Sequence, residues 1–210
     1  MNNLNSIWYN NDILNRNYMY PDYYNDYRNY CISMNQVDLI KQMNLVWEQH
    51  IMWTRMLLIS IASSLNDLEA TKARLLENPK DIANAFKKYY GNTIADTIQR
   101  LLTEHLVIGG DLMVALKNGN QKLASELNDK WYKNADDISD AFSSINPFYP
   151  REQIRKMLYD HLELTTSEVD ARLKGNYSAD IKAYDMVQKE ILLMSQFFVD
   201  GIVMQFPNLF

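Results

Sequence analysis

The chain has 210 residues, of which 47% are hydrophobic, and a formal net charge of −5 at pH 7. This length suits one sizeable domain or at most two small ones, and a negative net charge without a basic cluster argues against binding to nucleic acid. The single cysteine, Cys31, excludes an intramolecular disulfide and a zinc–thiolate cluster.

The sequence shows no sign of export or of a membrane span. Residues 1–11 lack the basic start and the apolar run of a secretory signal. The most apolar stretches, residues 56–62 and 191–199, are too short or too interrupted to cross a bilayer. We therefore expect a soluble, cytoplasmic protein.

Residues 1–34 differ in composition from the rest of the chain. They contain nine asparagines and seven tyrosines, and no apolar period of 3.6 residues runs through them. We interpret this segment as a flexible Asn/Tyr-rich arm. Two roles are open for it: an unstructured tail, or a docking segment for self-association or a partner.

From residue 35 onward, apolar side chains recur at helical spacing and predict an all-α protein. Gly91, Gly119, Gly175 and Pro147 mark breaks between helices. The pattern predicts helices over residues 35–64, 67–77, 79–90, 93–117, 120–145, 151–174 and 178–205. We expect these helices to form one bundle domain over residues 35–210.

The chain contains an internal repeat. Residues 78–86 and 134–142 are identical at five of nine positions after a shift of 56 residues, and a second shift of 56 leads to a weaker copy at residues 190–198. The helices before these segments repeat as well, since an acid precedes histidine in residues 102–106 and 158–162. We therefore expect an antiparallel bundle of three repeated helical hairpins in a pseudo-threefold arrangement, over about residues 35–91, 93–148 and 151–206.

The only three histidines of the chain fall at equivalent places in the three copies: His50, His105 and His161. Each lies on an apolar stripe with spacings of three and four, so each is expected to be buried. The apolar face of each partner helix carries one polar residue: Asn78, Asn134 and Glu190. In an antiparallel hairpin such a residue can lie level with its histidine, which predicts a buried layer of six polar groups.

A buried polar layer needs internal partners or a ligand, because an unpaired buried polar group costs roughly 1–3 kcal/mol. In one arrangement the three imidazoles and Glu190 bind a divalent transition metal, for which zinc, iron, manganese, nickel and copper all suit. In another, Asn78, Asn134 and Glu190 accept the ring N–H groups of the histidines as outer partners. A layer that only sets the register of the bundle is also open.

Three acidic residues are weaker candidates for metal ligands. Glu104 and Asp160 directly precede their histidines, so their side chains are turned about 100° away around the helix. Glu168 lies two turns beyond His161 on the same face. Small residues also follow the histidines by four positions and either open space beside the layer or permit close helix packing: Thr54, Gly109 and Thr165.

Several segments resemble a family of bacterial helical proteins: residues 47–55 (WEQHIMWTR), 104–106 (EHL), 131–136 (WYKNAD), 144–147 (SINP) and 200–206 (DGIVMQF). The resemblance covers most of the chain after residue 34 and implies a shared helical fold. Members are sometimes labelled acetylglutamate kinase. This chain has neither a glycine-rich phosphate loop nor an alternation of strands and helices, so the resemblance implies no activity.

The sequence thus favours a metal-binding helical bundle with a buried three-histidine site, at which an open coordination position would permit catalysis. It identifies neither a reaction nor a substrate. Two alternatives remain: a non-catalytic structural or interaction protein assembled through the arm, and a helical sensor of a small molecule.

Overall fold

The computed structural model describes residues 32–210, and within that range it contains helices and no strand. The all-α class is confirmed, whereas the arm lies outside the described residues except for its last three. The elements are α1 (Met34–Ser63), α2 (Leu68–Leu75), α3 (Asn78–Lys117), α4 (Gln121–Ile145), α5 (Arg151–Leu173), α6 (Tyr177–Gln205) and the 3-10 helix η5 (Pro207–Leu209). None of these helices is long and apolar enough to traverse a lipid bilayer.

The helices begin and end where the sequence provides the groups to cap them. The side chains of Ser33, Asn120 and Asn176 each accept a hydrogen bond from the backbone N–H three residues further on, at the starts of α1, α4 and α6. Gly119 and Gly175 adopt positive φ angles of 69° and 71° just after α3 and α5. The local signals therefore account for most of the observed boundaries.

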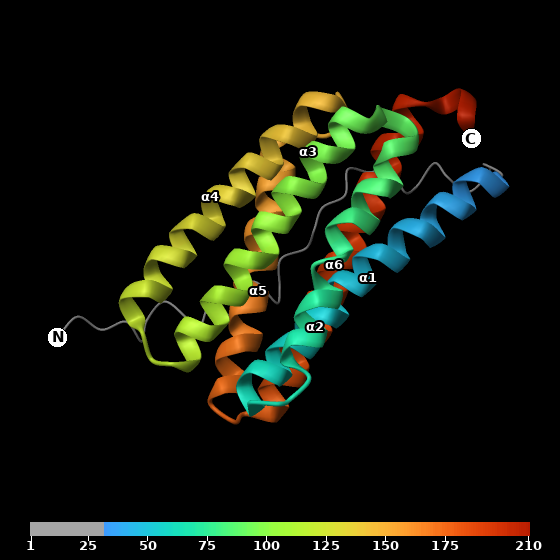
Figure 1. Ribbon diagram of the computed structural model, residues 1–210. Helices are drawn as coiled ribbons and strands as arrows, with labels where there is room; N and C mark the ends of the chain where they lie inside the picture. The colour runs from blue at the N-terminus through green and yellow to red at the C-terminus, as the bar shows by residue number, and fades with distance from the viewer. Residues whose placement is uncertain (1–31) are drawn as a thin grey trace.

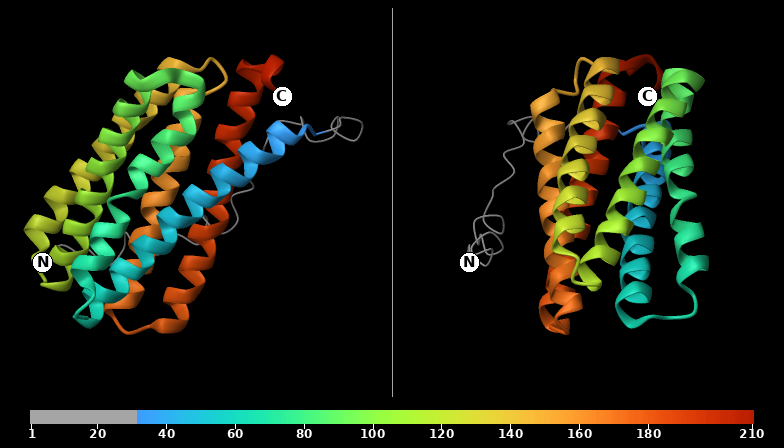
Figure 2. Two further views of the ribbon diagram at one scale, coloured as in Figure 1. Left: turned by 45° about the vertical axis from the view of Figure 1, so that its right-hand side comes forward. Right: turned by 60° about the vertical axis from the view of Figure 1, so that its left-hand side comes forward.

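The break that the sequence predicts at Gly91 lies inside the element that covers residues 78–117. The spacing predicts two helices there, and the structure has two helical parts that are joined at the non-helical Gly91 into one element of 40 residues, α3; the two parts run in opposite directions (Figure 2). The backbone angles of Gly91, φ 79° and ψ −179°, belong to a region that only glycine occupies readily. The chain changes direction at this residue without a loop.

The long helices lie side by side in one bundle (Figures 1 and 2). Helix α1 packs against α3, α3 against α4, α4 against α5 and α5 against α6, and α6 returns to α1. The helices therefore close a ring around a common interior, and the short α2 packs on α1 and contributes the buried Leu75 to that interior.

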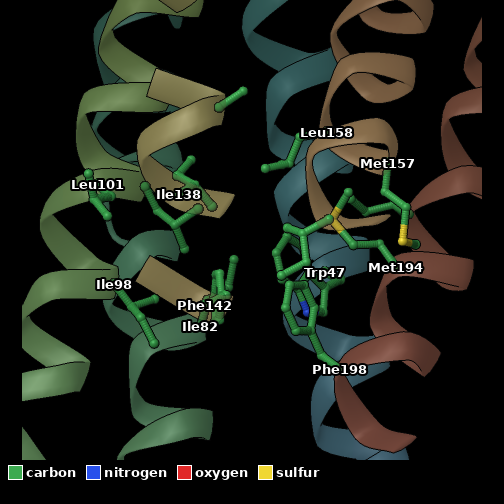
Figure 3. Close-up of a cluster of buried hydrophobic side chains, with 14 of the residues drawn as sticks. Trp47, Ile82, Ile98, Leu101, Ile138, Phe142, Met157, Leu158, Met194 and Phe198 are labelled. Carbon is green, nitrogen blue, oxygen red and sulfur yellow. The ribbon is translucent and has the colours of Figure 1, made fainter. Parts of the chain in front are cut away.

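Two hydrophobic clusters fill the interior of the bundle. The larger contains Trp47, Phe86, Phe142 and Phe198, whose ring centres are between 4.5 and 5.5 Å apart in the contacting pairs; Figure 3 shows part of this cluster. The smaller cluster consists of Leu57, Leu58, Ile61, Leu75, Leu106, Met113 and Val169. On α1 the larger cluster ends at residue 51 and the smaller begins at residue 57, so the region around His50 is the border between them.

Candidate metal centre

Helices α1, α3 and α5 each bring one histidine into the interior. His50, His105 and His161 are all buried, with 3–4% of their surface exposed. The ring centre of His50 lies 6.1 Å from that of His105 and 5.7 Å from that of His161, and the remaining pair is 6.2 Å apart. One ring nitrogen of each histidine lies within 4.8 Å of the others. The predicted burial of the three histidines is confirmed, and their imidazoles form a nearly equilateral triangle.

The first two histidines have the same outer partner. Nδ1 of His50 lies 3.2 Å from Oδ1 of Asn78, and Nδ1 of His105 lies 3.0 Å from Oδ1 of Asn134. Each asparagine also donates its amide N–H to the backbone carbonyl four residues before the histidine, at 2.8 and 3.1 Å. Because the amide nitrogen is used there, the amide oxygen faces the imidazole. Nδ1 therefore carries the proton, and the lone pair of Nε2 is left for a metal.

Glu190 occupies the corresponding position beside the third histidine. Its Oε2 lies 3.0 Å from Nδ1 of His161, while Oε1 is buried and has no hydrogen-bond partner among the described residues. Burial raises the pKa of Glu190, and the hydrogen bond with His161 opposes that rise. Glu190 is outside the group of side chains that share the centre. Of the two arrangements that the sequence allows for Glu190, these contacts match the one in which it accepts the ring N–H of a histidine.

The interior keeps the imidazoles of His50 and His105 neutral. Burial lowers the pKa of His50 well below its usual value, and the two neighbouring histidines lower it further. Burial also lowers the pKa of His105 to about 3, again with a contribution from His161. Neutral imidazole is the form that binds a metal, so His50 and His105 are in the ligating form at neutral pH.

A cavity of about 20 Å³ lies against the three imidazoles. Thr54, Gly109 and Thr165 line it one helical turn beyond the histidines, together with side chains of the smaller cluster that include Leu57 and Met113. The small side chains four positions after the histidines thus leave space next to the layer, enough for about one water molecule.

Two of the weaker candidates make local ion pairs. Glu104 is half-exposed and accepts a hydrogen bond from Arg100 at 2.9 Å, one turn earlier on α3. Asp160 is buried, and Nζ of Lys156 lies 2.6 Å from its carboxylate. Neither acid belongs to the group of side chains that share the centre.

Glu168 lies in a buried cluster of ion pairs that the sequence did not reveal. Nη1 of Arg55 is 2.5 Å from Glu168 and 2.8 Å from Asp180, and Arg172 is 3.1 Å from the same Asp180. Burial raises the pKa of Glu168 to about 7, while the charge of Arg55 opposes the rise. Asp180 gave no signal because an acid in the first turn of a helix is common.

Trp131 packs against the histidine layer. Its Nε1 donates to the carbonyl of His105 at 3.0 Å, and its ring centre lies 5.3 Å from that imidazole. Gly109 makes room for it, since a Cβ there would lie 3.1 Å from the indole ring. The glycine four residues after a buried histidine was the only sequence signal for this close contact.

Comparison with known proteins gave no match: no protein-family model, no curated protein and no solved structure is similar to this chain. The resemblance to the bacterial helical family therefore stays a prediction. The geometry of the site alone has to indicate the function.

Proposed function

We propose that this protein binds one divalent transition metal through His50, His105 and His161. The convergence of three buried imidazoles, with one nitrogen of each within 4.8 Å of the others, is the observation that carries the proposal. Zinc, iron, manganese, nickel and copper all accept imidazole ligands. Three protein ligands leave one position of a tetrahedral metal to a non-protein ligand, which is the condition for metal-assisted catalysis.

In this proposal Asn78, Asn134 and Glu190 are outer partners that fix the orientation of the rings. The carboxylate of Glu190 has a second role, because it offsets the charge of a dication held by three neutral ligands. Glu190→Gln should therefore weaken metal binding without changing the ligands. The visible spectrum of bound Co²⁺ tests this, and it should be the same in the wild type and the variant. A changed spectrum would mean that the carboxylate of Glu190 is itself a ligand of the metal.

We also propose that the three histidine–partner pairs belong to three related hairpins in a pseudo-threefold arrangement. In each pair Nδ1 of the histidine meets the side-chain oxygen of a residue 28 or 29 positions later. This common contact supports the repeat where the sequence similarity is weak, in the third copy.

Elemental analysis tests the metal proposal directly. The full chain is purified without a polyhistidine tag from medium that contains all five candidate metals, and it is compared with the His50→Ala/His105→Ala/His161→Ala variant. We expect about one equivalent of metal in the wild type and none in the variant. Equal metal content in both proteins, or none in the wild type, would contradict the proposal.

Single substitutions guard against a variant that merely fails to fold. His105→Gln keeps a polar side chain of similar size and should lose most of the metal while its helical circular dichroism is retained. Glu104→Gln alters the neighbouring, half-exposed residue and should keep the metal content of the wild type. Metal loss in both would point to a general loss of structure and not to a ligand.

A further inference from the structure

The cavity beside the histidine layer has room for very little. Its volume is about 20 Å³, and it is bounded by all three imidazoles together with Thr54, Thr165 and residues of the smaller hydrophobic cluster. A water molecule occupies about this much space when measured in the same way. Any ligand that meets a metal from this side must therefore be very small.

Thr165, which lines the cavity, has a hydroxyl that lacks a partner among the described residues. Thr165 is 3% exposed, and its Oγ1 makes no hydrogen bond within the described residues. The neighbouring Thr166 donates to the carbonyl four residues earlier at 2.8 Å, as does Thr54 at 2.7 Å. An unsatisfied buried hydroxyl is costly. Of these three threonines, Thr165 alone lacks a hydrogen-bond partner among the described residues, and it lines the cavity.

The other side of the histidine layer is filled. Trp47, one turn before His50, lies edge-on to that imidazole with ring centres 6.1 Å apart, and it stacks on Phe198. Beyond it the packed aromatic rings of the larger cluster continue (Figure 3). A non-protein ligand of the metal is thus restricted to the side on which Thr165 lies.

We propose that the cavity binds a single ligand of one or two non-hydrogen atoms, such as water, hydroxide or cyanide, which completes the coordination of the metal and accepts a hydrogen bond from Oγ1 of Thr165. This inference rests on the proposed function and adds the class of ligand to it. Thr165 is then a positioning residue for that ligand. Planar organic ligands of five or more atoms, such as imidazole, are excluded by volume.

The test uses the full chain loaded with Co²⁺, whose visible absorption reports the ligands of the metal. We expect cyanide to change the spectrum and to saturate, and imidazole at the same concentrations to have no effect. Thr165→Val removes the hydroxyl at nearly constant volume and should weaken cyanide binding about tenfold, the effect of one hydrogen bond. Its affinity for Co²⁺ should equal that of the wild type.

Two further variants make the comparison specific. Thr166→Val removes a buried hydroxyl that already has a backbone partner and should leave cyanide affinity unchanged. Thr165→Ser keeps the hydroxyl and should restore the affinity that Thr165→Val loses, which a purely structural role of the threonine would not produce.

The outcomes separate this inference from the proposed function. A protein that binds no Co²⁺ overturns both. A protein that binds Co²⁺ but no cyanide, or binds imidazole as tightly as cyanide, overturns the inference and leaves the metal site standing. Equal cyanide affinity in the wild type and Thr165→Val also overturns it.

Discussion

At the scale of single residues, Asn134 joins two buried polar groups. Its amide oxygen accepts from Nδ1 of His105, and its amide nitrogen donates to the carbonyl of Leu101. The same side chain therefore orients a proposed metal ligand and is itself held in place by a bond to a helical carbonyl. Stability and metal affinity should depend on it together.

Asn134→Leu should weaken metal binding by roughly 10- to 100-fold, because the ring of His105 loses the partner that orients it. It should also lower the free energy of unfolding by about 1–3 kcal/mol, because the buried Nδ1–H of His105 loses its partner. Competition with a chelator measures the first effect and urea denaturation the second. Ser139→Ala is the control, since Ser139 is buried in the same helix and its hydroxyl donates to the carbonyl of Ala135, away from the histidines. Wild-type affinity in Asn134→Leu would contradict the assigned role.

Glu168 should make stability depend on pH. Its pKa is raised to about 7 in the folded protein, against about 4.5 for an ordinary glutamate. The unfolded chain therefore ionises first, so the contribution of Glu168 to stability is fully present below pH 4.5 and is lost as the pH rises to about 7. The loss should be on the order of 1–3 kcal/mol.

Glu168→Gln should remove this part of the pH dependence. Urea denaturation at pH 5 and pH 8 gives the free energy of unfolding of the wild type and of the variant. The wild type should exceed the variant by more at pH 5 than at pH 8. The variant also loses its ion pair with Arg55, but the comparison rests on the change with pH. Glu104→Gln, at a half-exposed position, is the matched control. A wild-type advantage that is no larger at pH 5 than at pH 8 would rule out the raised pKa.

At the scale of elements, the break in α3 at Gly91 separates residues of two histidine–partner pairs. Asn78 lies before Gly91 and His105 lies after it. The backbone angles of this glycine therefore set the angle between the two parts of α3 that carry these residues. The periodic pattern stops at the glycine and resumes after it, and a break in periodicity does not distinguish a bend from a loop.

Gly91→Ala should lower the free energy of unfolding by about 1–3 kcal/mol, because alanine does not readily adopt the backbone angles of this residue. Apart from the adjoining backbone, no atom of residues 32–210 lies within 4 Å of the position that a Cβ would take, so the effect would come from the backbone conformation alone. The exposed Asn92→Ala should change stability by less than about 0.5 kcal/mol. Urea denaturation measures the free energy of unfolding of both variants. If Gly91→Ala were as stable as Asn92→Ala, the backbone strain inferred for alanine at residue 91 would be wrong.

At the scale of the whole molecule, the three proposed ligands come from α1, α3 and α5, which are far apart in the chain. A metal bound to all three would hold distant segments together only in the folded state. At a free metal concentration of 100 times Kd, it should raise the free energy of unfolding by about 2.7 kcal/mol.

Thermal unfolding with and without metal checks this linkage. The melting temperature of the wild type should rise with metal concentration and return to its starting value after chelation. That of the His50→Ala/His105→Ala/His161→Ala variant should not change. A similar rise in both would mean that the metal binds elsewhere on the chain.

Much of this protein follows from its sequence alone. Helical periodicity, with glycine, asparagine and proline at the breaks, determines the helices to within a few residues. Because a spacing of three or four fixes the face of a helix, it also determines that His50, His105 and His161 are buried and that Asn78, Asn134 and Glu190 share the apolar faces of their helices.

Only the tertiary structure decided how these faces meet. Spacing within a helix says nothing of its rotation and axial offset relative to a helix from another part of the chain, and these are set by packing of the whole core. For that reason the use of Nδ1 by the outer partners, the position of Glu190 against His161, the pairing of Glu168 with Arg55 and the cavity at Thr165 had to come from the folded molecule.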